Sequence, residues 1–144
     1  MKAPEILETC LYVDDLEAAE RFYAEVLGLQ FFAREEGRHV FFRCGSRMLL
    51  LFDPTATLPP GQDLPPHGTR GPGHLALGVP ADSIPAWKSR LRERGVEIET
   101  EAEWPSGQSS IYFRDPAGNS IELAPPGIWG IAESDALGGA RDQT

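Results

Sequence analysis

Short runs of alternating apolar and polar residues indicate where the strands of this chain lie. Successive side chains of a strand point to opposite faces, so each run predicts one apolar face and one mixed face. In the first run the apolar face carries Leu7, Thr9, Leu11 and Val13, and the other face carries Glu8, Cys10 and Tyr12. In a later run the apolar face carries Leu75, Leu77 and Val79, and the other face carries His74, Ala76 and Gly78.

These runs belong to an internal repeat. Val13 matches Val79 at an offset of 66 (79 − 13), and Phe42 matches Phe113 at an offset of 71 (113 − 42). A turn that is one residue longer then gives the final strands an offset of 72 (123 − 51). Each half therefore predicts a strand, a helix and three further strands.

One amphipathic helix is predicted in each half. The first begins at Asp14 or Asp15 and ends at Gly28, and the second begins near Asp82 or Ser83 and ends at Gly95. In both cases an apolar residue follows the glycine, which is typical of a Schellman-like helix end.

The repeat divides the chain into two modules of a single domain, residues 1–144. Module one covers about residues 5–53 and module two about residues 73–124. Between them, ten of the twenty residues 54–73 are Pro or Gly, so the segment 54–72 is predicted to be a linker without an element of its own. The tail, 125–144, contains Trp129, which we expect to pack back on the domain.

Three residues that can bind a metal lie on faces predicted to be free of helices. Glu8 and His74 occupy equivalent positions in the repeat, and Glu122 points away from the apolar face of the last strand. If these faces curve toward a common cavity, they form a site with one imidazole and two carboxylates. Such a set suits a divalent ion such as Zn, Ni, Mn, Co or Fe(II) and leaves coordination positions open for a substrate. The structural alternative is an exposed histidine and solvated glutamates.

Composition narrows the classes of function. The formal net charge of −9 argues against binding to nucleic acid, which requires a basic surface. No apolar run approaches the roughly 20 residues of a membrane span, and no signal peptide is visible. Cys10 and Cys44 cannot form a disulfide framework, so a cytoplasmic location with reduced thiols is expected.

Three segments resemble the vicinal oxygen chelate superfamily, which includes glyoxalases, bleomycin-resistance proteins and extradiol dioxygenases. They are ETCLYVDDLEAAERFYAEVLGL, GHLALGV and YFRDPAGNSIEL, and the resemblance covers about residues 5–125. It implies an α+β fold of two βαβββ modules, with a curved eight-stranded mixed sheet around a funnel and the helices outside. It also implies a metal at the base of the funnel, held by the first and last strands of each module.

These family positions map onto Glu8, His74, Glu122 and Leu50. Leu50 departs from the family's pattern of metal ligands, because glyoxalase I has at this position a glutamate that is both ligand and base. Three ligands without the fourth are closer to the fosfomycin-resistance transferases, which the first half also resembles.

Tyr112 and Arg114 are the candidate catalytic residues. They alternate with Ile111 and Phe113, so they are expected to face the cavity and to orient an anionic substrate or transfer a proton. The alternative is a structural hydrogen-bonding role.

Two classes of function follow from the sequence. The first is a glyoxalase-like metal-dependent enzyme, a lyase, transferase or dioxygenase acting on a small molecule. The second is a metal-free protein of the bleomycin-resistance type that binds a drug or another ligand. A homodimer is expected for either class, with neither a nucleic acid nor a membrane as partner.

Overall fold

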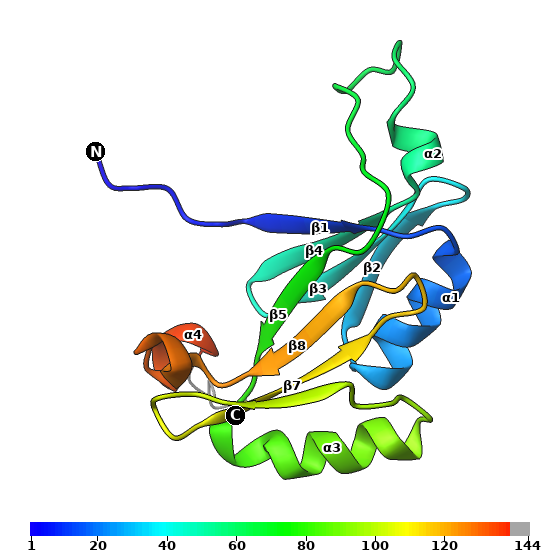
Figure 1. The fold of residues 1–144 in the computed structure, drawn as a ribbon. Helices are drawn as coiled ribbons and strands as arrows, with labels where there is room; N and C mark the ends of the chain where they lie inside the picture. Colours follow the sequence, from blue (N-terminus) through cyan, green and yellow to red (C-terminus); the bar gives the residue numbers. More distant parts are fainter. Residues whose placement is uncertain (139–144) are drawn as a thin grey trace, which may run out of the picture. The chain divides into compact units, whose positions relative to one another are not determined.

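A computed structural model of the chain, which describes residues 1–138, confirms the α+β class and the two βαβββ modules (Figure 1). The eight strands form two four-stranded mixed sheets. The chain divides into two compact units. Unit 1 contains residues 1–73 and 115–119, and unit 2 contains the described residues of 74–114 and 120–144.

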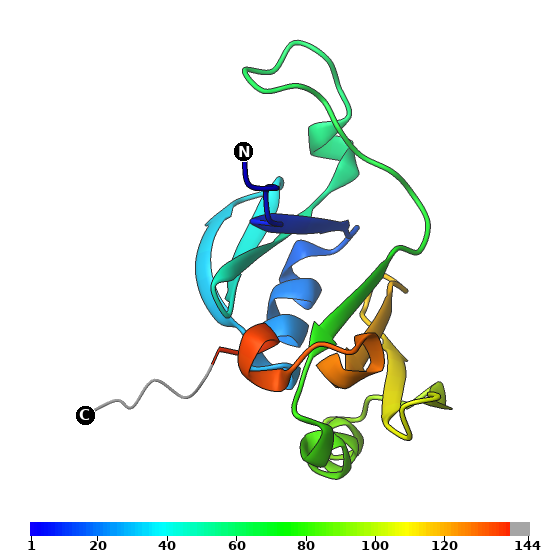
Figure 2. The same ribbon diagram turned by 90° about the vertical axis from the view of Figure 1, so that its left-hand side faces the viewer.

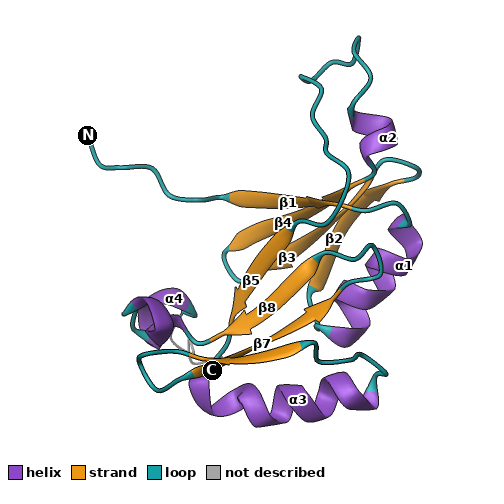
Figure 3. Ribbon diagram, viewed as in Figure 1, coloured by secondary structure: helices purple, strands orange, loops and turns teal. Residues whose placement is uncertain are grey.

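The sheet of unit 1 has the order β1-β4-β3-β2, with β1 parallel to β4 and the other neighbours antiparallel. Its elements are β1 (Glu8–Tyr12), α1 (Leu16–Arg21), β2 (Gln30–Glu35), β3 (His39–Cys44) and β4 (Arg47–Phe52). The helix α1 contacts β3 and β4 (Figure 3). Ala19 and Tyr23 are fully buried, as are Phe42 and Leu51 of the sheet, so the core lies between the helical segment and one face of the sheet.

The helical segment of unit 1 differs from a regular α-helix. Asp15 is the N-cap, because its carboxylate accepts a hydrogen bond from the amide of Ala18. After α1 the chain continues as a π-helix, η1 (Phe22–Val26). The amide of Leu29 then bonds to the carbonyl of Tyr23, six residues earlier, so the segment holds one more residue than the matching helix end of unit 2.

The sheet of unit 2 repeats the same order, β5-β8-β7-β6, with β5 parallel to β8. Its elements are β5 (His74–Gly78), η2 (Ala81–Ser83), α3 (Ile84–Glu93), β6 (Thr100–Glu103), β7 (Ser109–Arg114) and β8 (Ser120–Ala124). The helix α3 contacts β7 (Figure 3). It ends as predicted, since Gly95 has a φ of +73° and the amide of Val96 bonds to the carbonyl of Leu91.

Two expectations about the connecting segments are corrected. Residues 54–72 are not wholly without structure, because Asp53 caps one short helix, α2 (Pro54–Thr57), before the loop extends away from the sheet of unit 1 (Figure 2). Trp129 does not pack back on the domain. It ends the turn η3 (Pro126–Trp129) and is 79% exposed.

The tail then forms a further turn, α4 (Glu133–Ala136), and its residues 139–144 lie outside the described part of the chain. Among residues 1–138, no helix has the length and apolar character needed to cross a membrane.

Candidate functional site

Three of the candidate residues gather on one face of the sheet of unit 2. Tyr112 of β7 and Glu122 of β8 are direct partners in the strand register, and Ser120 of β8 pairs with His74 of β5. The side chains at these positions point to the face opposite the one covered by α3, where Ile111 is fully buried. The alternation predicted from the sequence thus brings His74, Tyr112 and Glu122 together.

His74 and Glu122 form the centre of this group. The imidazole Nε2 lies 3.5 Å from Glu122 Oε2, and the Glu122 side chain is only 7% exposed. The other ring nitrogen, Nδ1, lies 3.0 Å from the carbonyl oxygen of Ser120. Because a carbonyl oxygen can only accept, Nδ1 carries a hydrogen, and in the neutral ring Nε2 keeps a lone pair directed toward the carboxylate.

One oxygen of Glu122 has no hydrogen-bond partner. Within residues 1–138, Oε1 of Glu122 is buried and unpaired, and Gln108 Oε1 is the other side-chain atom in that condition. An unpaired buried acceptor costs roughly 1–3 kcal/mol, so a hydrogen donor or a cation placed beside Oε1 would stabilise Glu122.

Tyr112 completes the group. Its ring lies nearly parallel to that of His74, with the ring centroids 6.2 Å apart. Burial and a hydrogen bond with Glu122 raise the pKa of the Tyr112 phenol, while Ser110 lowers it by a smaller amount. The phenol therefore stays protonated at neutral pH and acts as a hydrogen donor.

Arg114 lies on the same face of the sheet, but its guanidinium group is bound to Glu99. Its Nε lies 2.8 Å from Glu99 Oε2, and its Nη2 lies 3.1 Å from Glu99 Oε1. This two-point contact lowers the pKa of the Glu99 carboxyl and raises that of Arg114. Arg114 thus has a structural partner, and its predicted role toward an anionic substrate stays a prediction.

Glu8 and Leu50 lie in unit 1 at the positions that match His74 and Glu122. Leu50 pairs with Cys10 in the register of β1 and β4, as Glu122 pairs with Ala76 in the register of β5 and β8. The offsets of 66 (76 − 10) and 72 (122 − 50) are those of the sequence repeat. Glu8 is exposed and Leu50 is buried, so unit 1 offers one carboxylate and an apolar position where unit 2 has an imidazole and a carboxylate.

No complete metal site is formed by either unit alone. Within residues 1–138, no three His, Cys, Asp or Glu side chains of one unit gather closely enough to hold a metal ion. The addition of Glu8 to His74 and Glu122 therefore stays a prediction.

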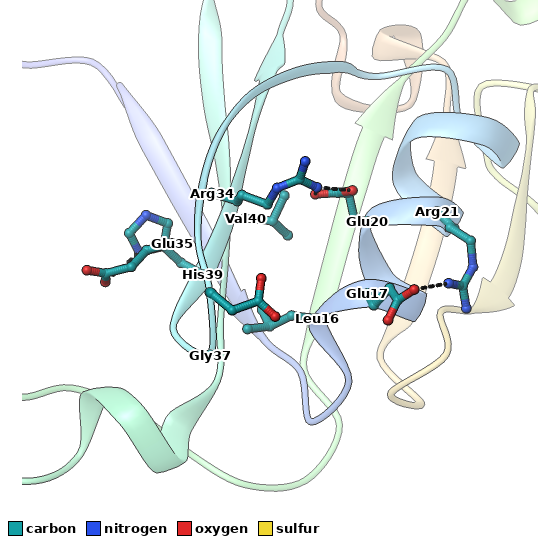
Figure 4. A pocket seen from close by; sticks show the side chains of 10 residues that line it. Leu16, Glu17, Glu20, Arg21, Arg34, Glu35, Gly37, His39 and Val40 are labelled. Atoms are coloured by element: carbon teal, nitrogen blue, oxygen red, sulfur yellow. Dashed lines mark hydrogen bonds and ion pairs between the residues drawn. The ribbon is translucent and has the colours of Figure 1, made fainter.

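A separate pocket of about 340 Å³ lies in unit 1, between α1 and the hairpin of β2 and β3 (Figure 4). Charged side chains line it, and ion pairs join Arg34 to Glu20 and Arg21 to Glu17. None of the predicted site residues is among those that line this pocket.

Sequence reasoning missed several polar residues that organise unit 1. His67 of the segment between the two modules lies with Nδ1 2.6 Å from the Tyr12 hydroxyl and packs against Phe52. Burial and a contact with Cys10 raise the Tyr12 pKa to about 12, so the phenol stays protonated at neutral pH. The segment DPAGN forms the turn between β7 and β8, and its polar residues Asp115 and Asn119 are both buried. Their four-residue spacing is the only sequence signal of this role.

Most of the chain matches one known protein family. Residues 5–123 match the model of the Glyoxalase/Bleomycin resistance protein/Dioxygenase superfamily. The chain belongs to this superfamily. This confirms the resemblance found in the sequence.

Two lactoylglutathione lyases are among its relatives. The one from Haemophilus influenzae is 32% identical over 125 residues, which are 83% of this chain and 90% of the relative. The crystal structure of the one from Agrobacterium tumefaciens is 42% identical with a TM-score of 0.87, and the match covers 90% of this chain and all of that chain. A shorter match, 33% identical over 51 residues, joins 35% of this chain to 33% of the metallothiol transferase FosB of Bacillus licheniformis.

Proposed function

We propose that this superfamily member is a metal-dependent enzyme that acts on a small molecule, with His74 and Glu122 as metal ligands and Glu8 as the third. The observation that carries the proposal is the buried carboxylate of Glu122, whose Oε1 is unpaired and whose Oε2 lies 3.5 Å from Nε2 of His74. An ordinary surface ion pair would not leave a buried carboxylate oxygen unpaired.

The residues present fit a divalent metal. A metal-binding histidine usually donates its second ring N–H to a backbone carbonyl, and His74 does so to Ser120. One imidazole with carboxylates suits Zn, Ni, Mn, Co or Fe(II), among which the donor set does not select. When bound, such an ion would act as a Lewis acid toward substrate oxygens.

The chain itself would supply the proton chemistry. Tyr112, protonated at neutral pH, lies beside Glu122 and can donate a hydrogen bond to an oxygen on which negative charge develops. Glu122 is buried, which favours a role as a metal ligand over a role as a solvent-exposed base. Arg114 is paired with Glu99. It would therefore attract an anionic substrate group only with the part of its positive charge that Glu99 does not neutralise.

The two lactoylglutathione lyases support a lyase-type reaction as the first activity to assay. Leu50 limits that inference, because an apolar side chain stands where glyoxalase I has a glutamate that serves as ligand and base. We therefore propose a less specific activity, a metal-assisted reaction on a small molecule with two neighbouring oxygens. Formation of S-lactoylglutathione is one such reaction to be tested.

The test is metal binding and its dependence on the proposed ligands. Protein purified without chelator or affinity metal is analysed for its elements and titrated calorimetrically with Mn²⁺, Ni²⁺ and Zn²⁺. His74→Ala and Glu122→Gln are expected to weaken binding at least about a hundredfold, since each removes a ligand and not only a supporting residue. His39→Ala is the matched control, because it removes an imidazole on the sheet of unit 1.

Equal binding by His74→Ala and the parent would contradict the proposed site. A parent that binds none of the three ions would contradict the enzyme proposal and favour the alternative, a ligand-binding protein of the bleomycin-resistance type. If metal binds, Tyr112→Phe is expected to keep the metal affinity and to lower the rate of S-lactoylglutathione formation or of another metal-dependent reaction.

A further inference from the structure

The turn between β7 and β8 is built around two buried polar residues, Asp115 and Asn119. The Asp115 carboxylate accepts four hydrogen bonds. Oδ1 accepts from the amides of Ala117 and Asn119, at 3.0 and 2.9 Å. Oδ2 accepts from the hydroxyl of Tyr23 at 2.8 Å and from Nδ2 of Asn119 at 3.0 Å. Asp115 therefore holds the side chain of Asn119 in one orientation.

The remaining bonds of Asn119 connect two other segments of unit 1. Its Nδ2 also donates to the carbonyl oxygen of Tyr12 at 3.1 Å, and its Oδ1 accepts from the amide of Gly73 at 2.7 Å. Only this amide orientation works, because the flipped group would place an oxygen against a carbonyl and a carboxylate, and an NH₂ against an N–H. Asn119 is 1% exposed, so water does not replace these bonds.

Two backbone positions held by the bonds of Asn119 and Asp115 adjoin the His74–Ser120 pair. Gly73 is the residue before His74, and Asn119 itself is the residue before Ser120. The carbonyl oxygen of Ser120 is the acceptor for Nδ1–H of His74, and the two residues are partners at the start of the pairing of β5 with β8. One side chain thus fixes the residue that precedes each member of the His74–Ser120 pair.

We propose that Asn119 is a positioning residue for His74, which it orients by holding Gly73 and its own backbone, the residues that precede His74 and Ser120, so that Nδ1–H meets the Ser120 carbonyl and Nε2 faces Glu122. This inference rests on the proposed function for its purpose, the presentation of a metal ligand. Its structural content concerns only the imidazole and does not require a metal. A histidine at the first residue of a strand is otherwise subject to fraying, which would release the ring from Ser120.

The experiment is ¹⁵N NMR of the three histidines in metal-free protein, at a pH where the rings are neutral, followed by titration with Zn²⁺. In the parent, the His74 signals, assigned by their loss in His74→Gln, are expected to show the Nδ1–H tautomer. Asn119→Ala is expected to give a mixture of tautomers and to weaken Zn²⁺ binding about tenfold or more.

Tyr23→Phe is the matched control. It removes one hydrogen bond to the same Asp115 carboxylate but leaves the bonds of Asn119 to Gly73 and Tyr12 in place. We expect it to lower the stability of the fold while His74 keeps the Nδ1–H tautomer and the parent's Zn²⁺ affinity. An equal tautomer shift in Tyr23→Phe would show a general loss of structure and would overturn the positioning role.

A milder variant serves if Asn119→Ala does not fold. In Gly73→Ala the added Cβ would lie 3.3 Å from Asn119 Oδ1 and 3.1 Å from Leu11 Cδ2, so it pushes the Gly73 amide away from Asn119. A smaller shift of the His74 tautomer in the same direction is expected. A parent-like tautomer in the folded variant, whether Asn119→Ala or Gly73→Ala, overturns the inference.

The tautomer and the metal titration separate two failures. A parent that shows the Nδ1–H tautomer but binds no metal contradicts the proposed function, while the response of the tautomer to Asn119→Ala still decides the positioning role. A parent that binds metal through His74 but keeps its tautomer and affinity in Asn119→Ala supports the function and overturns the positioning role alone.

Discussion

The hydroxyl of Tyr23 donates a hydrogen bond of 2.8 Å to the Asp115 carboxylate, although the two residues are 92 positions apart in the chain. Tyr23 is fully buried, and burial together with the neighbouring carboxylate raises the pKa of its phenol far above the ordinary value. The hydroxyl is therefore a permanent donor, and the Asp115–Asn119 turn is anchored to the helical segment of unit 1.

The Tyr23–Asp115 bond predicts a loss of stability in Tyr23→Phe. The variant keeps the ring in the core but leaves a buried carboxylate with one donor fewer, which costs about 1–3 kcal/mol. Urea unfolding followed by tryptophan fluorescence measures the difference. An unchanged free energy of unfolding would mean that water reaches Asp115 in the variant.

Glu122 is expected to reduce the stability of the metal-free chain. In unit 1 the corresponding pair is Phe41 and Leu50, which are register partners just as Tyr112 and Glu122 are. The double variant Tyr112→Phe with Glu122→Leu copies that pair and removes the unpaired Oε1, so the free energy of unfolding should rise by about 1–3 kcal/mol. Metal binding should be lost at the same time.

Thermal unfolding of the metal-free parent and the double variant measures this effect. The single variant Tyr112→Phe is the control, since it keeps the buried carboxylate and should not gain stability. A double variant that is less stable than the parent would mean that Glu122 is satisfied in solution by a partner outside the described contacts.

The surroundings of His39 predict that the free energy of unfolding decreases at mildly acidic pH. Its Nδ1 lies 2.6 Å from Nη1 of Arg38, which can only donate, so the folded state requires the neutral ring with a lone pair on Nδ1. Burial and the charge of Arg38 lower the His39 pKa, while Glu35 opposes the shift. The contribution of neutral His39 is complete above its unfolded pKa of about 6.5 and is lost as pH falls from there through the folded pKa.

The measurement compares urea unfolding at about pH 8 and about pH 5.5 in the parent and in His39→Gln, which does not titrate. The parent should lose more stability than the variant across this range. An equal loss in both proteins would assign the pH dependence to other groups.

The oligomeric state can be checked directly. The strands β1 and β2 in unit 1, and β5 and β6 in unit 2, are at the edges of their sheets. Proteins cover or protect such edges, and two-fold dimers are the commonest oligomers, so a homodimer is expected. Sedimentation at micromolar concentration should give a species of about twice the 15.8 kDa chain mass, and a species near the single-chain mass would contradict the prediction.

The sequence by itself determined the repeat, the order of elements in each half and the faces of the strands. The offsets of 66, 71 and 72 are the offsets of the observed registers, since the partners of Leu50, Cys10 and Phe41, correspond to the partners of Glu122, Ala76 and Tyr112. These features are local and periodic, so burial of one face fixes them. For that reason the alternation of apolar and polar residues is enough to place His74, Glu122 and Tyr112 on one face.

Tertiary structure decided the contacts that hold these residues. The bond of Tyr23 to Asp115, the contact of His67 with Tyr12 and the engagement of Arg114 by Glu99 each join segments that no periodic pattern relates. The extra residue of the π-helix could not be predicted from the sequence for the same reason. A hydrogen bond depends on the position of a single atom, and packing sets that position across the fold. An alternating pattern sets only the face on which a side chain lies.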